Sequence, residues 1–471
     1  MSHQKPSQQV TGSSLWMWGL LALLAFLPLP FGANRPWAAD LMGVVTASLI
    51  FLMLRTEPNA PWQELSQRIR LRASLIGFTL VLAWSFIQTL SSTPASWHHP
   101  FWKEAASILS PMTGSISIDP TLYFESCARF LSYILIFVLA FVAGSDSKRA
   151  LLCLKSLTLI GTSYALYGLI AYAAGTETIL WYKKWAYHTF LTSTFVNKNS
   201  YAAYAGLTLL PTLSYVRQRF KDKWRNHKAH KKNAFMFLES LSLIDLAFLL
   251  SPIIILAALS LTGSRAGTIS SLCAVMAFFI SLKINRRRRK GKQYFVSALI
   301  LLGFLFFVLI GGHTLITRFE VNYLSQDTEL RLNAYKLALM AIGDNPWTGF
   351  GFDTFDTAFR LYRDATLPVW FHHAHNDYLE MIMDLGLPAA LLLFLSLASL
   401  ISCCMSGVAN RHQNAVYPAM GVAASTLIII HSLFDFSMHI PAIAALYAAL
   451  LGIACAQSWS HRITNGNPLR N

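Results

Sequence analysis

Residues 386–406 read GLPAALLLFLSLASLISCCMS and contain no charged side chain. An apolar run of about 20 residues is long enough to cross the hydrocarbon core of a bilayer as one α-helix. About twelve such runs occur along the chain, whose 471 residues are 54% hydrophobic and only 13% charged. The sequence therefore predicts an all-α, polytopic integral membrane protein that forms a single membrane domain over residues 1–471. The predicted spans are residues 15–32, 37–54, 74–90, 123–144, 150–175, 199–216, 241–263, 267–283, 295–312, 386–406, 416–436 and 440–460.

The distribution of charge predicts how the chain is oriented in the membrane. Lys and Arg number 38 against 22 Asp and Glu, a formal net charge of +16. The densest basic runs are residues 217–232 and 286–292. Because cytoplasmic loops carry an excess of Lys and Arg, we expect both runs and both termini to be cytoplasmic. Patches for nucleic acid or anionic lipid are the alternative interpretation of these runs, but topology explains them and no nucleic-acid partner is expected.

Two other features of the sequence exclude simpler classes of protein. Residues 15–32 could be a cleaved signal peptide, but the run is long for one and a second apolar run follows at once. The six cysteines lie in or beside apolar stretches and include no C-x-x-C pair. They therefore predict neither a disulfide framework nor a zinc site.

Two long loops are predicted on the outer side of the membrane. They are residues 91–122 and residues 313–385, and loops of that length are uncommon unless they are functional. Within the second loop, residues 328–342 have a partly apolar helical face formed by Leu330, Leu332, Tyr335, Leu337 and Leu339. We expect a short helix there, lying against the outer membrane face. The loop 313–385 is expected to be periplasmic and to carry the active site.

The richest group of polar residues lies where this loop meets the tenth span. It contains His372, His373, His375, Asn376 and Glu380. A neutral histidine is a natural general base near neutral pH, which makes His375 the candidate base. A metal site is a second interpretation, although the spacing does not match a ligand motif. A histidine cluster that only sits in the interfacial zone is a third.

Arginines form the second group of candidates. Arg129 lies within the fourth span and Arg265 lies between the seventh and eighth spans, while Arg331 and Arg35 lie beside the membrane. A charge at such depth usually faces a cavity or a partner. Several guanidinium groups around one outer pocket would suit a phosphate or a diphosphate. In the alternative, Arg265 reaches the interface and Arg129 pairs with Glu125 one turn earlier.

Two further polar patches could contribute to a site. Asn197, Lys198 and Asn199 open the sixth span, where free backbone N–H groups could bind an anion or sugar hydroxyls, or where the residues could cap the helix. His431 and Asp435 are four residues apart in the eleventh span and are expected to face one another. A proton relay and helix packing are both consistent with that pair.

The motifs that carry a family resemblance occur in order along the chain. They are FVNKNSYA at 195–202, SRAG at 264–267, Arg331 upstream of DNPWTGFG at 344–351, and HNDYLE at 375–380 followed by Gly386. Together they resemble the O-antigen ligase and polysaccharide polymerase superfamily of bacterial membrane glycosyltransferases. The nine residues between Asn376 and Gly386 match the ligase pattern. FGANRPW at 31–37 and HSLFDF at 431–436 look more like exopolysaccharide polymerases.

The resemblance implies a GT-C type glycosyltransferase that works on the periplasmic side of the bacterial inner membrane. The donor would be a glycan on undecaprenyl diphosphate, and the acceptor a hydroxyl of a growing glycan or of lipid A–core. A chain-length regulator and export proteins are further expected partners. His375 would take the acceptor proton while Arg265, Arg331 and Arg129 stabilise the leaving diphosphate. Asn197, Lys198, Asn199, His373, Asn376 and Glu380 would bind the glycan or support the site.

No cofactor and no metal are expected for this reaction. The donor is already activated, and the sequence has no Walker or Rossmann glycine motif for a nucleotide. Asp353 and Asp356 are the candidate pair for a divalent cation, but arginines beside the diphosphate make a cation redundant. The sequence therefore predicts a metal-independent, inverting transfer.

Other activities remain open from the sequence. Polymerisation of exopolysaccharide or O-antigen is the main prediction, and ligation to lipid A–core is the alternative within the same superfamily. A transporter or flippase of the lipid-linked glycan would also have about twelve spans, but it predicts two related halves, and no such repeat is found. A protein O-oligosaccharyltransferase shares the motifs and differs only in its acceptor.

Overall fold

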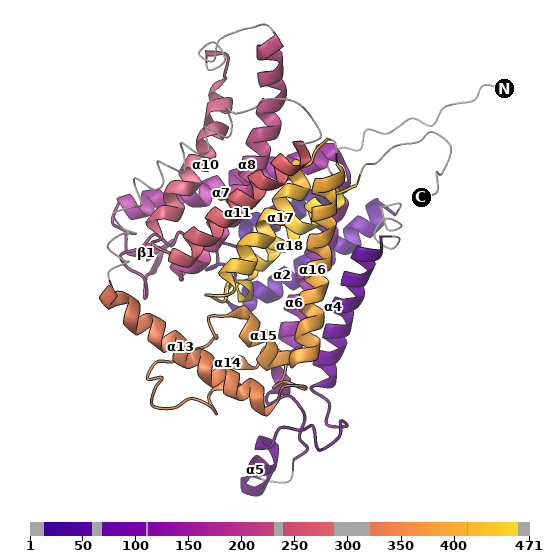
Figure 1. Cartoon of the computed structure of the whole chain (residues 1–471), viewed down its shortest axis with the longest axis vertical. Helices are drawn as coiled ribbons and strands as arrows, with labels where there is room; N and C mark the ends of the chain where they lie inside the picture. Colours follow the sequence, from indigo (N-terminus) through magenta and orange to yellow (C-terminus); the bar gives the residue numbers. More distant parts are fainter. Residues whose placement is uncertain are drawn as a thin grey trace, which may run out of the picture.

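The computed structural model describes residues 14–58, 68–109, 112–229, 239–286, 321–411 and 413–459, and almost all of its regular structure is helical (Figure 1). In these residues the strands are β1 (Thr178–Ile179) and β2 (Tyr182–Lys183), which pair antiparallel. The long helices are α2 (Pro36–Thr56), α4 (Ile69–Ile87), α6 (Tyr123–Ser145), α7 (Ser147–Ala173), α8 (Lys198–Ala229), α10 (Leu243–Leu261), α11 (Arg265–Arg286), α13 (Val321–Asp344) and α16 (Leu387–Asn410). The shorter helices are α1 (Leu15–Phe26), α5 (Phe101–Ile108), η1 (Pro120–Leu122), α14 (Phe355–Phe359), α15 (Asp377–Leu385), α17 (Val416–His431), η2 (Ser437–His439) and α18 (Pro441–Ala456).

The helices confirm an all-α, multi-pass membrane protein. Within the described residues, 7 helices are long and apolar enough to cross a membrane, and α1, α17 and α18 are shorter apolar helices. The ninth predicted span, residues 295–312, lies outside the described residues, as does most of the basic run 286–292. Each of the other predicted spans coincides with a helix. The eleventh ends early, because α17 stops at His431 rather than continuing to residue 436.

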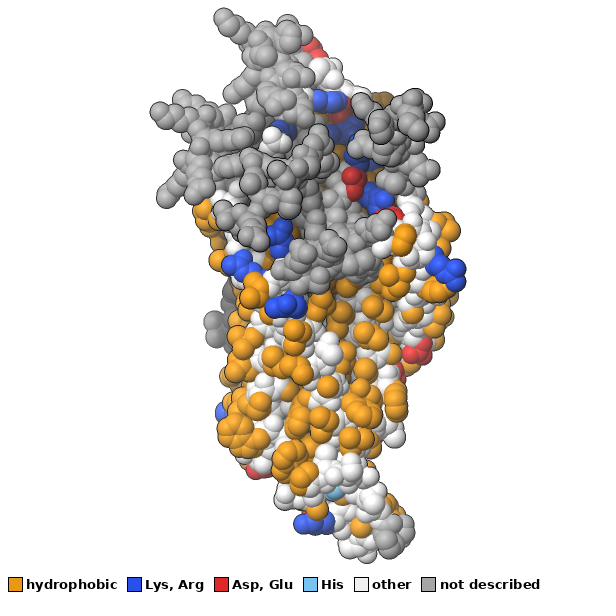
Figure 2. Space-filling view, turned by 90° about the vertical axis from the view of Figure 1, so that its right-hand side faces the viewer, with side chains coloured by type: hydrophobic (Ala, Val, Ile, Leu, Met, Phe, Trp, Pro, Cys, Tyr) orange, Lys and Arg blue, Asp and Glu red, His pale blue; other side chains and the backbone are white. Residues whose placement is uncertain are grey.

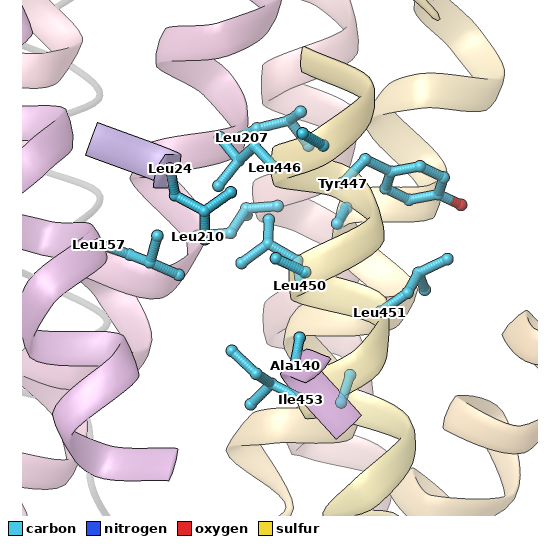
Figure 3. Packing of buried hydrophobic residues seen from close by; sticks show 14 of the residues in the cluster. Leu24, Ala140, Leu157, Leu207, Leu210, Leu446, Tyr447, Leu450, Leu451 and Ile453 are labelled. Atoms are coloured by element: carbon cyan, nitrogen blue, oxygen red, sulfur yellow. The ribbon is translucent and has the colours of Figure 1, made fainter. Parts of the chain in front are cut away.

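Helix α18 forms the centre of the bundle. Its side chains are almost all buried, and Figure 3 shows Leu446 and Leu450 directed toward α1, α7 and α8, with Tyr447 and Leu451 on another side. Small residues let α18 and α6 approach closely, as is common in membrane helix packing. A Cβ added to Gly452 would lie 2.4 Å from the carbonyl oxygen of Phe137. A larger side chain at this position would therefore force the two helices apart.

The outer surface of the bundle is apolar where it would contact lipid. Figure 2 shows hydrophobic side chains covering most of one flank, with Lys and Arg side chains gathered toward its upper end. Exposed residues on this kind of surface include Phe51 and Leu80, which are 60% and 51% exposed. Such side chains can face lipid without a free-energy cost, because the acyl chains are equally apolar.

An additional layer lies across one end of the bundle. Figure 1 shows α13 and α14 running beneath the bundle and α15 between them and α16. The predicted helix at 328–342 is confirmed and is longer than expected, since α13 covers Val321–Asp344. Leu332 and Leu339 of the predicted apolar face are exposed on the protein surface, and its contact with the membrane stays a prediction. The residues that α13 packs against α14 and α15 are Ala334, Leu337, Ala338, Ala341 and Ile342.

The two loops predicted on the outer side contact each other. The backbone N–H of Ile118 donates to the carbonyl of Phe350 at 2.8 Å, and the ring of His99 lies 5.2 Å from the ring of Phe350. Gly351 is needed at this contact, because its φ is +111° and an added Cβ would lie 2.2 Å from Oγ of Ser117. The contact places the described parts of the two loops, residues 91–109, 112–122 and 321–385, at the same end of the bundle, which agrees with the prediction that both lie on one side of the membrane.

Candidate active site

His375 has the most unusual backbone conformation of the predicted site residues. Its φ is +52°, in the left-handed region, which is uncommon for any residue other than glycine, although Asn, Asp and His adopt it more often than the rest. The hydroxyl of Tyr335 donates to its carbonyl oxygen at 2.9 Å. Its ring makes edge contacts with Phe371 and Phe436, with centroids 5.4 Å and 4.9 Å away. Strained residues that are held by their surroundings in this way cluster at functional sites.

A buried carboxylate lies next to His375. Nδ1 of His375 is 3.6 Å from Oδ1 of Asp435, and the side chains are 20% and 0% exposed respectively. Burial would raise the pKa of Asp435, but His375 outweighs it and holds the pKa below its usual value. The side chain of Asp435 is therefore charged at neutral pH. A proton on Nδ1 of His375 faces this charge, which leaves Nε2 as the basic nitrogen.

The position of Asp435 follows from the early end of α17. Helix α17 ends at His431, but the N–H of Asp435 still donates to the carbonyl of His431 at 3.1 Å and His431 helps to lower the pKa of Asp435, so the two residues lie close together. Nδ1 of His431 lies 3.0 Å from the hydroxyl of Ser437. The chain then turns so that the Asp435 side chain reaches His375 from another segment.

Glu380 holds the segment that precedes His375. It is 1% exposed, and its two carboxylate oxygens accept from Nδ1 of His373 at 2.8 Å and from the N–H of Ala374 at 2.9 Å. Burial would raise the pKa of Glu380, but His439 and His373 lower it to about 2. Burial would lower the pKa of His373, but Glu380 outweighs it and raises that pKa. Glu380 and His373 thus form a buried ion pair that supports the His375 loop.

The helix that follows His375 begins with a side-chain cap. The side chain of Asn376 accepts from the N–H groups of Tyr378 and Leu379, each at 3.1 Å, and its amide donates to the carbonyl of Leu433 at 3.3 Å. Asn376 therefore ends the strained loop and starts α15. The geometry gives Asn376 a supporting role among the residues predicted to bind glycan or support the site.

One group of side chains has a spacing that could hold a metal ion. Donor atoms of His373, Glu380 and His439 lie within 4.8 Å of one another. Nε2 of His439 is also 3.5 Å from Oδ1 of Asp377. Burial lowers the pKa of His439. In this cluster His373 and Glu380 form an ion pair with each other, so these side chains can support the His375 loop without a metal ion.

The candidate metal pair Asp353 and Asp356 is divided between two environments. Oδ2 of Asp353 lies 3.3 Å from the guanidinium of Arg129. Asp356 is on the surface of the outer layer, where it lies 3.1 Å from Nδ1 of His372 and 3.3 Å from Arg360. Each carboxylate thus has its own cationic partner.

Arg331 and Arg265 reach the end of the bundle that holds His375. Arg331, on α13, donates to the carbonyl of Phe434, directly before Asp435. Arg265 begins α11, which packs along α17. Gly206 lies between Ser271 of α11 and Leu427 of α17, so the first turns of α11 are beside the last turns of α17. Arg265 is half-buried, and among the described residues no ion pair is found for it.

The patch at 197–199 opens α8 at the same end. The side chain of Asn197 accepts from the N–H of Asn199 at 2.8 Å. This contact agrees with the second interpretation of these residues, in which they cap the helix. Nζ of Lys198 lies 3.9 Å from the centroid of the Phe190 ring. A Cβ added to Gly267 would meet Ala202, so this patch lies near the start of α11. The structure thereby brings the patch and Arg265 to one end of the bundle.

Arg129 has a different environment from the other two arginines. Its guanidinium pairs with Glu125 at 3.2 Å, as the alternative interpretation anticipates, and with Asp353 at 3.3 Å. It lines a cavity of about 450 Å³ whose walls come from α4, α6, α16, α17 and α18. The polar end of this cavity is formed by Ser126, Arg129, Asp353, Asp377, Ser432 and His439. Most of the remaining lining is apolar, including Phe130, Tyr133, Phe394, Leu397, Tyr447 and Leu451.

Comparison with known proteins gives one family match. Residues 250–394 match the family model described as O-Antigen ligase. The match confirms the resemblance to the O-antigen ligase and polysaccharide polymerase superfamily, and it covers Arg265, Arg331 and the His375 segment. It supports a membrane O-antigen ligase or polymerase type of function, with a lipid-linked glycan and an acceptor as substrates. A search of curated proteins finds no match to the chain.

Sequence reasoning missed two residues of the site. The sequence pairs Asp435 with His431, because residues four apart lie on the same face of a helix. It gives no sign that the Asp435 side chain contacts His375. His439 was not singled out, although it follows Phe436 in a polar turn between two apolar runs. The signal for both was the dense sequence HSLFDFSMHIP, in which seven polar or aromatic residues interrupt a span and predict a turn more readily than a helix.

Proposed function

We propose that this protein polymerises a glycan by transferring it from undecaprenyl diphosphate to an acceptor sugar hydroxyl in the periplasm. The observation that carries the proposal is the strained His375 with the buried Asp435 behind it. A general base needs a free basic nitrogen and an oriented ring, and this pair supplies both. The family match over 250–394 supports the substrate class.

The reaction divides between the base and the arginines. The acceptor oxygen attacks the anomeric carbon while its proton passes to Nε2 of His375, and the carbon–oxygen bond to the diphosphate breaks. Asp435 stabilises the imidazolium that forms. Arg265 and Arg331 stabilise the negative charge that develops on the leaving diphosphate. Attack from the face opposite the leaving group inverts the anomeric centre, and no step requires a metal ion. The spans and the large outer layer at 313–385 would then form a GT-C type enzyme.

The cavity supports a polyprenyl donor. Its apolar walls suit the first isoprene units, and its polar end carries the cation of Arg129 next to Asp377 and His439. Asp377 is two residues from His375, so a chain in this cavity would present its head group near the proposed base. Arg129 already has two carboxylate partners. A diphosphate would therefore have to replace one of these contacts to bind Arg129.

The proposal is tested with purified protein, a lipid-linked donor and a chelator. Wild type is expected to turn over under these conditions, and His375→Ala is expected to lose roughly 10²–10⁴-fold in rate. Donor binding should be retained, because the arginines remain. Loss of wild-type activity with chelator would contradict a metal-independent reaction. Activity in His375→Ala together with an inactive His373→Ala would move the site to the cluster of His373, Glu380 and His439.

Ligation to lipid A–core is the second candidate function. The spacing from His375 to Gly386 and the description of the matching family favour it. Deletion of the gene separates the two activities. A single repeat unit left on the lipid carrier identifies a polymerase, whereas long polymer left on the carrier identifies a ligase.

The orientation of the site is tested by reporter fusions. The basic side chains at the upper end of Figure 2 support a cytoplasmic location for that end in an inner membrane. Fusions after Lys232 and Lys292 should report the cytoplasm, and a fusion near Gln326 should report the periplasm. A periplasmic signal after Lys292 would overturn both the orientation and the periplasmic placement of His375.

A further inference from the structure

A cluster of three aromatic side chains and one arginine lies outside the proposed catalytic site. We call Phe31, Arg35, Tyr182 and Trp185 the aromatic platform. The Phe31 ring makes edge contacts with Tyr182 at 5.3 Å and with Trp185 at 5.5 Å between centroids. The guanidinium of Arg35 lies over Phe31 and over Trp185, at 5.4 Å and 5.7 Å. Tyr182 is 49% exposed and Trp185 is 53% exposed, so much of both rings is available to a ligand.

The backbone fixes the orientation of these rings. Phe31 has a φ of +56° and Ala33 a φ of +58°, and Leu180, in the turn between β1 and β2, and Tyr187, after β2, have φ values of +55° and +56°. Left-handed backbone at a residue other than glycine costs of order 1–3 kcal/mol. A tryptophan that only anchors a protein at the membrane interface needs the right depth and no fixed orientation. The strained backbone in both segments that carry the platform, residues 31–33 and 180–187, therefore favours binding of a specific ligand over anchoring in the membrane.

The platform is joined to the proposed catalytic end of the bundle. The N–H of Ala442 donates to the carbonyl of Gly32 at 3.1 Å, directly after Phe31. A Cβ added to Gly32 would lie 2.7 Å from the Phe195 ring and 3.0 Å from Ile440. Ile440 follows the turn that carries His439. The loop that supports Phe31 is thus packed against Phe195, two residues before the patch at 197–199, and against the segment that follows the His439 turn.

The surroundings of the platform are polar as well as aromatic. Beside the hairpin that is labelled β1 in Figure 1, Lys183 is exposed, and His188 and Glu177 form a pair at 3.8 Å. Aromatic faces pack against the C–H faces of sugar rings, and neighbouring cations donate to hydroxyl or carboxylate oxygens. A mixture of rings and donors suits a glycan better than it suits an acyl chain, which would meet unpaired charges.

We infer that the aromatic platform binds pyranose rings of the glycan, a few sugars away from the bond that His375 forms. The inference deepens the proposed function and rests on it for the identity of the ligand. A bound chain would pack sugar rings on Tyr182 and Trp185, with Arg35 donating to their oxygens. The platform would then hold the chain near the site between successive transfers.

Binding is measured separately from transfer. The probe is the surface polysaccharide of the producing cells, cleaved to short oligosaccharides and titrated into purified protein in detergent, with saturation-transfer NMR as the readout. Trp185→Ala and Tyr182→Ala are each expected to weaken binding roughly three- to tenfold, since one aromatic contact contributes about 0.5–1.5 kcal/mol. Trp185→Phe keeps a ring and should recover most of the affinity.

Trp37 provides the matched control. It is 56% exposed and close to Arg35 in sequence, but among the described residues it makes no ring or cation contact. Trp37→Ala should leave binding unchanged. Equal loss in Trp37→Ala and Trp185→Ala would identify an interfacial anchor, and unchanged binding in both Trp185→Ala and Tyr182→Ala would also overturn the inference. If Trp185→Ala and Tyr182→Ala weaken binding but the wild-type protein shows no transfer activity, the platform inference stands and the proposed function is contradicted.

Discussion

Replacement of Asp435 by asparagine tests the proposed base more sharply than removal of His375. Two unit charges about 4 Å apart interact by about 4 kcal/mol at an effective dielectric constant of 20. The Asp435 side chain is fully buried and 3.6 Å from Nδ1, but His375 is one-fifth exposed, which screens part of this energy. We expect about 3 kcal/mol less stabilisation of the imidazolium in the transition state, or roughly a hundredfold lower kcat. The assay is transfer from lipid-linked donor under saturating substrate.

A second aspartate–histidine pair in the outer layer serves as the control. Asp356 lies 3.1 Å from Nδ1 of His372, but its side chain and that of His372 are 36% and 70% exposed. Asp356→Asn should therefore change kcat less than about threefold, as expected for an exposed pair. Donor binding by Asp435→Asn should stay close to that of wild type. A kcat within threefold of wild type for Asp435→Asn, in folded protein, would refute the assignment of Asp435 as the partner of the base.

Three further outcomes follow from the same geometry. Arg265→Lys and Arg331→Lys keep the charge but lose the planar fork, so each should lower kcat roughly tenfold to a hundredfold at normal protein level, and near wild-type rates in both would place the diphosphate elsewhere. Glu380→Gln should lower the thermal unfolding midpoint most near pH 5–6. Because the pKa of His373 is raised in the folded protein, the stabilisation by His373 is complete below about pH 6.5 and is lost as the pH rises through its folded pKa. Because the pKa of Glu380 is lowered, the stabilisation by Glu380 is complete above about pH 4.5 and is lost as the pH falls toward about 2. An equal loss of thermal stability in Glu380→Gln at pH 9 would therefore contradict the ion pair. Gly386→Ala should destabilise the fold by at least about 1–2 kcal/mol when unfolding is measured in detergent, because the φ of Gly386 is +76° and an added Cβ would lie 2.4 Å from the carbonyl oxygen of Trp347. An unchanged unfolding midpoint would show that the loop adjusts.

The spans were predictable because each depends on local composition. An apolar run of sufficient length has few alternatives to a membrane helix, so the segments that became α2 and α16 could be identified without any tertiary information. The end of α17 was less predictable. The polar and aromatic residues of HSLFDFSMHIP are a signal for a turn, but only the contacts of Asp435 with His375 and of His431 with Ser437 show where the chain turns.

The assembly of the site depends on contacts that sequence separation conceals. His375 and Asp435 are far apart along the chain, as are Glu57 and its partner Arg149 at 2.9 Å. Residue type indicated that His375 and the arginines could carry chemistry, but it did not indicate which carboxylate would face the histidine. The Asn376 cap and the Glu380 ion pair are local to the motif, and for that reason their supporting roles were within reach of the sequence.

The left-handed backbone at residue 375 also affects the choice of substitutions for experiments. Alanine in this conformation carries the full steric penalty of a Cβ against the following carbonyl, so His375→Ala changes the loop's conformational preference as well as its chemistry. Asparagine adopts the same region more readily and has no basic nitrogen. A His375→Asn protein would therefore keep the native loop and remove proton transfer alone, which makes it suitable for trapping donor and acceptor together for structure determination.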